Sequence, residues 1–146
     1  MRLAARPLAA FLQKIRRELK LQAVEVSVAF VSDAEMAKWN ESYRGKQGPT
    51  DVLSFPAGTQ WQRKQIPSDA RKQRKSSEVQ ERYLGDIAIA PETARRYAKQ
   101  SGRSLNVELR ILMLHGVLHL MGYDHESDNG QMNRIEQRLR RRLGIA

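Results

Sequence analysis

The 146-residue sequence predicts an α+β domain in which a small mixed β-sheet packs against helices. Three observations support this class. Short runs rich in β-branched residues, at 24–31, 51–55 and 83–90, are typical of strands. Segments between and around them carry apolar residues at helical spacing. One segment, 104–122, is apolar on most sides after Arg110, which predicts a central buried helix.

The N-terminal segment is expected to form a helix that packs on the domain. It is rich in arginine and has no acidic residue before Glu18, which also resembles a transit peptide. Apolar residues nevertheless recur in it at helical spacing, and a strand-like run follows almost at once. These residues are Leu8, Phe11, Leu12, Ile15 and Leu19. We therefore predict a first helix rather than a removed segment.

The next two elements have clear start and stop signals. Ser32 and Glu35 form a capping box, which predicts a helix from Ser32 to about Tyr43. After a turn-rich loop, the strand at 51–55 is expected to stop at Pro56, because proline cannot donate a backbone hydrogen bond.

Residues 59–82 show no clean periodicity, and basic residues outnumber acidic ones there. We expect a basic mobile loop within a single domain spanning 1–146. Its candidate RNA-binding residues are Arg71, Lys72, Arg74 and Lys75.

The C-terminal half is expected to hold three helices. Pro91 suits the first turn of a helix that Gly102 ends, and Ser104 can cap the following central helix. A last helix is predicted from about 129 to 143. Its apolar face carries Met132, Ile135 and Leu139, and its other face carries Arg134, Arg138, Arg140 and Arg141.

The composition of the chain indicates which partners it can bind and which metal ligands it can supply. The chain has 26 Lys and Arg against 16 Asp and Glu, a net charge of +10, which indicates a polyanionic partner such as nucleic acid or else a solvated basic surface. Cysteine is absent, so a metal site would have to use His, Asp or Glu, and the absence fits a reducing compartment. No apolar run reaches membrane-spanning length.

All three histidines lie within one stretch, HGVLHLMGYDH. His115 and His119 are four residues apart, so a helix places both rings on one face. Gly122 allows a sharp turn that can bring His125 back toward them. Three converging imidazoles with an open fourth position are typical of a catalytic zinc site. The alternative for a buried histidine is a hydrogen-bonded core residue. Asp124 or Glu126 is a candidate acceptor for a ligand N–H, or else each is a surface carboxylate.

The spacing of the histidines also matches that of metzincin proteases, with one departure. Those proteases carry a glutamate directly after the first histidine as general base, and here that position is Gly116. A protease function is therefore disfavoured.

HGVLHLMGYDH resembles the signature of the YbeY family of bacterial metal-dependent endoribonucleases. Two further blocks are similar to that family, NESYRGKQGPTDVLSFP at 40–56 and YLGDIAIAPE at 83–92. The resemblance implies zinc on His115, His119 and His125, a basic groove for single-stranded RNA, and action on 16S rRNA 3′ ends and in ribosome quality control. It further implies association with the small ribosomal subunit and its assembly factors, in the cytoplasm, and we expect a monomer.

Within the similar blocks, Arg44 is the candidate catalytic residue. A guanidinium can clamp the charge that grows on a phosphate during hydrolysis. The alternative is a surface arginine that pairs with Asp51 or with a helix end. Asp86 is a candidate to orient backbone or a metal ligand, or has a structural role. Thr50, Asp51 and Ser54 fit a turn and a strand better than they fit catalysis.

Two rival functions remain open from the sequence. One is a metal-dependent hydrolase of another substrate, such as a degenerate peptidase. The other is a ribosome-assembly factor that mainly binds rRNA and whose zinc is structural.

Overall fold

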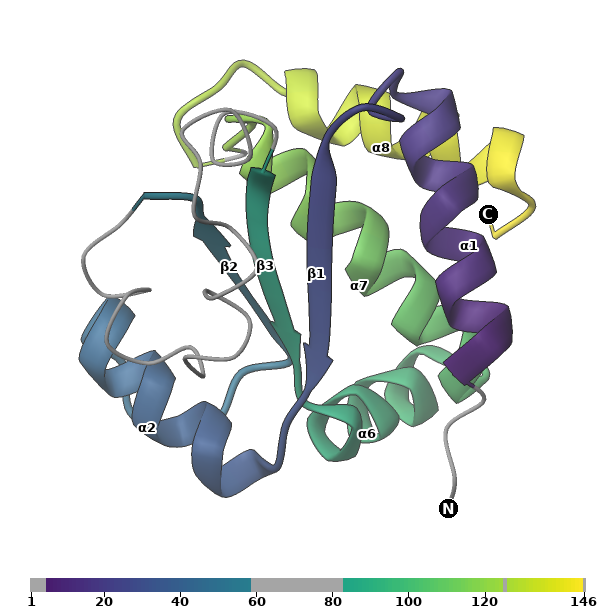
Figure 1. Ribbon diagram of the computed structural model, residues 1–146. Coiled ribbons are helices and arrows are strands. Elements are labelled where there is room, and N and C mark those ends of the chain that lie inside the picture. Colours follow the sequence, from purple (N-terminus) through teal and green to yellow (C-terminus); the bar gives the residue numbers. More distant parts are fainter. Residues whose placement is uncertain (1–4, 59–82, 125, 146) are drawn as a thin grey trace.

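The computed structural model describes residues 5–58, 83–124 and 126–145 (Figure 1). Helices and strands alternate along much of the chain, as the sequence predicts. Their bounds are α1 (Ala5–Glu18), β1 (Glu25–Phe30), α2 (Asp33–Arg44), β2 (Val52–Pro56), β3 (Tyr83–Ile89), α6 (Pro91–Ser101), α7 (Leu105–Leu120) and α8 (Gln131–Leu143). The basic segment 59–82 lies outside the described residues.

The described strands form a mixed sheet in the order β1-β3-β2. β3 pairs in parallel with β1 and antiparallel with β2, so it occupies the centre. Ile87 of β3 is in register with Val28 on one side and Ser54 on the other. The predicted mixed α+β class is therefore confirmed. β2 runs through Pro56, which pairs at the sheet end with Gly85, one residue further than predicted.

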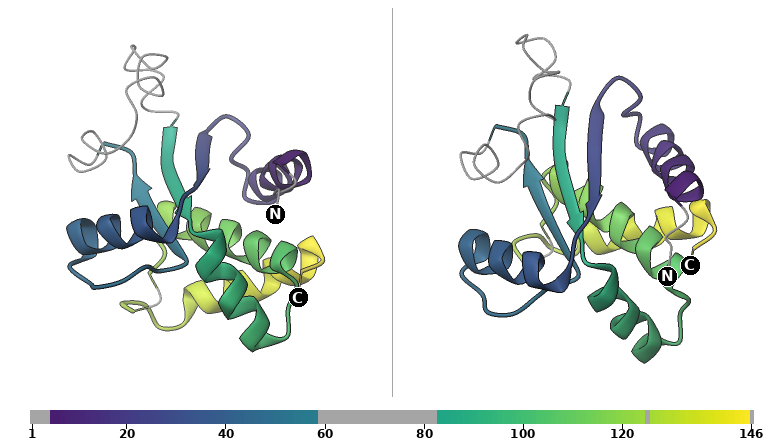
Figure 2. Two further views of the ribbon diagram at one scale, coloured as in Figure 1. Left: turned by 90° about the horizontal axis from the view of Figure 1, so that it is seen from below. Right: turned by 60° about the horizontal axis from the view of Figure 1, so that its bottom comes forward.

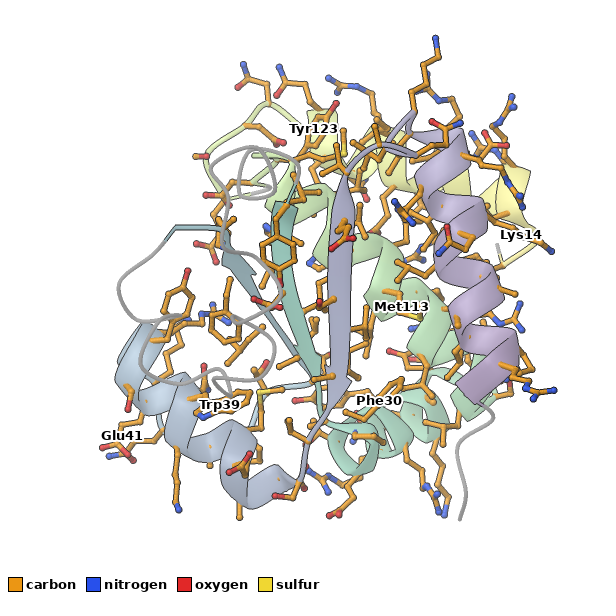
Figure 3. The ribbon with its side chains drawn as sticks, viewed as in Figure 1. Lys14, Phe30, Trp39, Glu41, Met113 and Tyr123 are labelled. Atoms are coloured by element: carbon orange, nitrogen blue, oxygen red, sulfur yellow. The ribbon has the colours of Figure 1, made fainter. Side chains whose placement is uncertain are left out.

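The main core lies between the sheet and the helices that pack against it. α7 contacts β2 and β3, and α1, α6 and α8 contact α7. Figure 2 shows α6, α7 and α8 grouped on one side of the sheet, with α2 beside β2. In Figure 3, Met113 lies within this helical layer, whereas Lys14 and Glu41 point outward. A smaller cluster packs between α2 and the sheet and contains Met36, Leu53, Phe55, Ala88 and Ala90.

α7 is the buried central helix that the sequence predicts. Ser104 caps it by accepting a hydrogen bond from the Val107 backbone N–H at 3.2 Å. At Gly116 the helix approaches β3 so closely that an added Cβ would lie 2.8 Å from Cγ2 of Ile87. The helix ends at Leu120, two residues earlier than predicted, and Gly122 then turns the chain with φ of +100°.

The predicted start of α8 and the predicted exposure of one arginine need correction. α8 begins at Gln131 because Gly130 adopts φ of +88° and the Asp128 carboxylate accepts from the backbone N–H groups of Gly130 and Met132. The prediction that Arg140 lies on the outer face is wrong. Its side chain is only 19% exposed, and it turns inward to a carboxylate one turn earlier. In the part of the chain that the structure describes, no helix is long and apolar enough to cross a membrane.

Candidate metal and RNA site

The site begins with two histidines on α7. Their four-residue spacing places the rings one turn apart on the same face, with centroids 4.5 Å apart. The two Nε2 atoms converge to 3.0 Å. At this distance one of these nitrogens donates a hydrogen bond to the other. The same convergence is what two imidazoles need in order to bind one ion.

The turn after α7 carries the third histidine of the motif. The Tyr123 N–H donates back to the Leu118 carbonyl, and the Glu126 N–H donates to the Asp124 carboxylate. His125 itself lies outside the described residues. Over those residues, no group of three or more His, Asp or Glu side chains is placed to hold a metal ion.

A carboxylate on α8 lies directly behind the first histidine. The His115 Nδ1 is 2.7 Å from the Glu136 Oε1, and the Arg140 guanidinium donates to the Glu136 Oε2 at 3.0 Å. Burial by itself would raise the pKa of Glu136. The hydrogen bonds with His115 and Arg140, together with the electrostatic effect of these two side chains, outweigh burial, so the pKa of Glu136 lies below its ordinary value. Glu136 is therefore an ionised hydrogen-bond acceptor at neutral pH.

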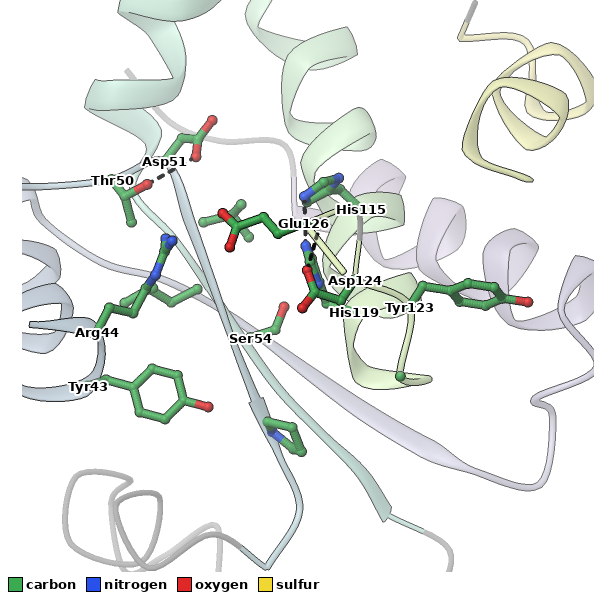
Figure 4. A pocket seen from close by; sticks show the side chains of 14 residues that line it. Tyr43, Arg44, Thr50, Asp51, Ser54, His115, His119, Tyr123, Asp124 and Glu126 are labelled. Atoms are coloured by element: carbon green, nitrogen blue, oxygen red, sulfur yellow. Dashed lines mark hydrogen bonds between the residues drawn. The ribbon is translucent and has the colours of Figure 1, made fainter. Parts of the chain in front are cut away.

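The two histidines open into a cleft of about 450 Å³ (Figure 4). The end of α2, the loop after it, β2 and the turn after α7 form its walls. The lining residues are Tyr43, Arg44, Thr50, Asp51, Val52, Leu53, Ser54, Pro56, His115, His119, Gly122, Tyr123, Asp124 and Glu126. Figure 4 shows Arg44 on one side of β2 and the histidines on the other.

The walls combine one guanidinium with several carboxylates. Arg44 is exposed and forms no ion pair with another described residue. Asp51, Asp124 and Glu126 supply three carboxylates. Burial raises the pKa of Asp51, although two backbone N–H groups donate to it. Among the described residues that line the cleft, carboxyl groups therefore outnumber guanidinium groups.

Comparison with known proteins assigns the chain to a family. Residues 3–144 match the family model described as Endoribonuclease YbeY.

The chain belongs to the YbeY family.

Several relatives and one solved structure agree with this assignment. The Endoribonuclease YbeY of Koribacter versatilis is 38% identical over 138 residues, which cover 94% of this chain and 76% of that protein. The Endoribonuclease YbeY of Roseiflexus sp. is 40% identical over 126 residues, covering 84% and 72%. The solution structure of a Thermotoga maritima protein superposes with a TM-score of 0.57 at 26% identity, covering 97% of this chain and 85% of that one.

The structure brings together some of the predicted site residues of this YbeY chain and not others. Arg44, His115, His119 and Asp124 line the same cleft. Asp86 does not line it. It is in register with Phe55, on the side of the sheet that packs toward α2, and Tyr83 donates a hydrogen bond to it. His125 and the basic residues 71–75 lie outside the described residues.

Sequence reasoning missed two sets of residues around the site. Thr50, Asp51 and Ser54 were expected only to form a turn and a strand, yet all three line the cleft. Glu136 lies roughly where the YbeY family has a similar residue, but the sequence alone assigned it no role in the site. The sequence pattern could have identified Glu136, because this residue lies between Met132 and Leu139 on the buried face of α8, where a carboxylate needs a hydrogen-bond partner.

Proposed function

We propose that this chain is a metal-dependent endoribonuclease that hydrolyses phosphodiester bonds in single-stranded RNA. The observation that carries the proposal is the convergence of the His115 and His119 Nε2 atoms in a cleft that also holds Arg44. Relatives that are 38% and 40% identical to this chain over 138 and 126 aligned residues bear the name endoribonuclease, which supports the same activity.

We assign the metal, expected to be one zinc ion per chain, to His115, His119 and His125. The residues fit such an ion in two respects. The described pair of histidines already directs nitrogen atoms at one point, with a carboxylate behind His115 as metal-bound histidines usually have. The described lining of the cleft also carries more carboxyl groups than guanidinium groups, so a divalent ion would offset part of that negative charge before a phosphate enters. A divalent ion there would supply Lewis acidity and activate water near neutral pH.

The role of Arg44 in this proposal is to bind the scissile phosphate. Its guanidinium has no competing ion pair within the described chain, and it lines the cleft from the end of α2. A planar fork of N–H donors matches two oxygens of one phosphate. Charge on those oxygens grows as the P–O bond breaks, so the contact strengthens in the transition state.

The proposed substrate is ribosomal RNA, at the 3′ end of 16S rRNA, in maturation and ribosome quality control. The proposed partners are the small ribosomal subunit and its assembly factors, in the cytoplasm. The similarity to the YbeY family and the net charge of +10 support this assignment.

Metal analysis beside RNA cleavage tests the proposal. Purified protein should contain about one divalent ion per chain, and it should cut a single-stranded fragment of the 16S rRNA 3′ end faster than the same sequence in a duplex. Chelation should abolish cleavage and added zinc should restore it. His115→Ala, His119→Ala and His125→Ala should each lose metal, whereas Tyr97→Ala, an exposed ring outside the cleft, should retain it. RNA binding without cleavage at any metal concentration would overturn the proposed endoribonuclease activity and favour the role of a ribosome-assembly factor.

A further inference from the structure

The contacts of Glu136 link α8 to the cleft through a single histidine. Its side chain is only 9% exposed, and its two oxygens have different partners. Oε1 lies 2.7 Å from the His115 Nδ1, and Oε2 accepts from the Arg140 guanidinium at 3.0 Å. Because Arg140 lies one helical turn after Glu136, α8 itself sets the direction of the carboxylate.

These contacts determine which nitrogen of His115 carries the ring proton. An ionised carboxylate only accepts hydrogen bonds, so Nδ1 must be the donor. In the neutral ring, Nε2 is then unprotonated, and its lone pair points to His119 and the cleft. In the metal-free protein, His119 is the donor between the two Nε2 atoms. The tautomer follows here from the hydrogen-bond network.

We propose that Glu136, held by Arg140, is a positioning residue that keeps His115 in the Nδ1-protonated tautomer, so that Nε2 presents its lone pair to the metal. This inference rests on the proposed metal function. Neither residue lines the cleft, so neither is placed to touch the substrate. Loss of a carboxylate behind a metal-bound histidine typically weakens metal binding by about 10- to 100-fold.

The chemistry of Arg140 allows a specific test by the variant Glu136→Gln. Arginine has only donors, so the amide oxygen of the new side chain must face Arg140. The amide NH₂ group must then face His115, which forces Nδ1 to accept and moves the ring proton to Nε2. We therefore expect the near-isosteric variant to reverse the tautomer. In the double variant Glu136→Gln with Arg140→Met, the amide is free to turn, so the original tautomer should return.

The experiment measures tautomer and metal affinity on the same samples. Nitrogen-15 NMR of the metal-free protein reports which ring nitrogen of His115 is protonated, and competition with a chelator reports the zinc dissociation constant. Glu136→Gln should show an Nε2-protonated His115 and bind zinc at least about tenfold more weakly. The double variant should recover part of that loss. Thermal melting confirms that each variant is folded.

Glu108→Gln is the matched control, because Glu108 is also a buried carboxylate paired with an arginine but does not contact either described histidine. It should leave the His115 tautomer and the zinc affinity unchanged. An Nε2-protonated His115 in the wild type, or a Glu136→Gln protein with wild-type tautomer and affinity, overturns the role of Glu136. The failure of wild-type protein to bind zinc at all overturns instead the proposed metal function.

Discussion

Two buried carboxylates contact or belong to the central helix, and their partners differ in kind. Glu108, in the first turn of α7, pairs at 2.8 Å with the Arg103 guanidinium, which is 37% exposed and lies just before the helix. Glu136, on α8, pairs with His115, whose other ring nitrogen faces the cleft. Both carboxylates are almost fully buried and both have an arginine partner. The difference teaches that burial and pairing do not identify a functional carboxylate, whereas the surroundings of its partner do.

The largest expected effect comes from the cleft itself. Arg44→Ala should lower single-turnover cleavage by about a hundredfold, as for the loss of one oxyanion-type donor, with near-normal zinc content and melting temperature. Arg103→Ala, which removes an arginine from the Glu108 pair, should leave cleavage unchanged. Arg44→Lys should restore only part of the rate, because an ammonium lacks the paired fork. Wild-type cleavage by Arg44→Ala would show that Arg44 does not bind the scissile phosphate.

A substitution on the side of α7 that faces the sheet should lower the stability of the protein. Gly116→Ala places a methyl group within 3 Å of the buried Ile87 side chain, so the helix and β3 must move apart. We expect a loss of about 1–3 kcal/mol in the free energy of unfolding, measured by denaturant titration. Gly102→Ala cannot serve as the control, because φ at Gly102 is +70° and alanine would be strained there. Ala98→Gly on α6 serves for comparison, because it removes a buried methyl group instead of adding one. An unchanged stability in Gly116→Ala would mean that this contact is not tightly packed.

Removal of the Glu108 side chain tests whether this carboxylate affects only the stability of the fold and not the binding of metal. Glu108→Ala should lower the free energy of unfolding by about 1 kcal/mol, because a buried charged hydrogen bond is lost while the partly exposed Arg103 can turn to water. Zinc affinity should not change. A tenfold loss of zinc affinity in this variant would break the distinction between the two carboxylates.

The smallest expected effect is at a third carboxylate, in a more exposed pair. Burial would raise the pKa of Asp33, but hydrogen bonds from Thr93 and Arg96 and the charge of Arg96 lower it overall. A lowered pKa in the folded state means that the ionised form adds stability above the ordinary aspartate pKa, and this is lost as the pH falls through the lowered value. Asp33→Asn should cost under about 1 kcal/mol at pH 7, because Arg96 is largely exposed.

Melting temperatures across pH check the sign of that effect. The wild type and Asp33→Asn should differ at pH 7 and converge in acid, at a pH below the lowered pKa of Asp33, where the wild-type carboxyl is protonated as well. A difference that grows toward low pH would show that the pKa of Asp33 is not lowered by folding.

Local signals predicted most of the fold. The Ser32 cap, Pro91 and the apolar stripe of the first helix each act within a few residues, and the structure has α2, α6 and α1 where these signals place them. Element ends were less predictable. α8 starts late because Asp128 and Gly130 build a turn whose geometry depends on both residues together.

The candidate site was predictable only where its residues are neighbours in sequence. His115 and His119 follow from helical spacing alone. The cleft positions of Asp51 and Ser54 depend on β2 packing against α7, and the Ser54 hydroxyl reaches the Gly116 carbonyl 62 residues away. Glu136 meets His115 only because α8 crosses α7 at that point. Spacing within one element cannot predict a contact between two elements.

The close packing at Gly116 also limits how this protein can evolve. A metzincin-like peptidase needs glutamate at that position, and here its first side-chain atom would overlap the Ile87 side chain. The backbone carbonyl of Gly116 also accepts a hydrogen bond from the Ser54 hydroxyl. A glutamate at position 116 therefore requires a smaller residue at 87 or a movement of α7 away from β3. The histidine spacing is shared with peptidases, but no single substitution leads from this cleft to theirs.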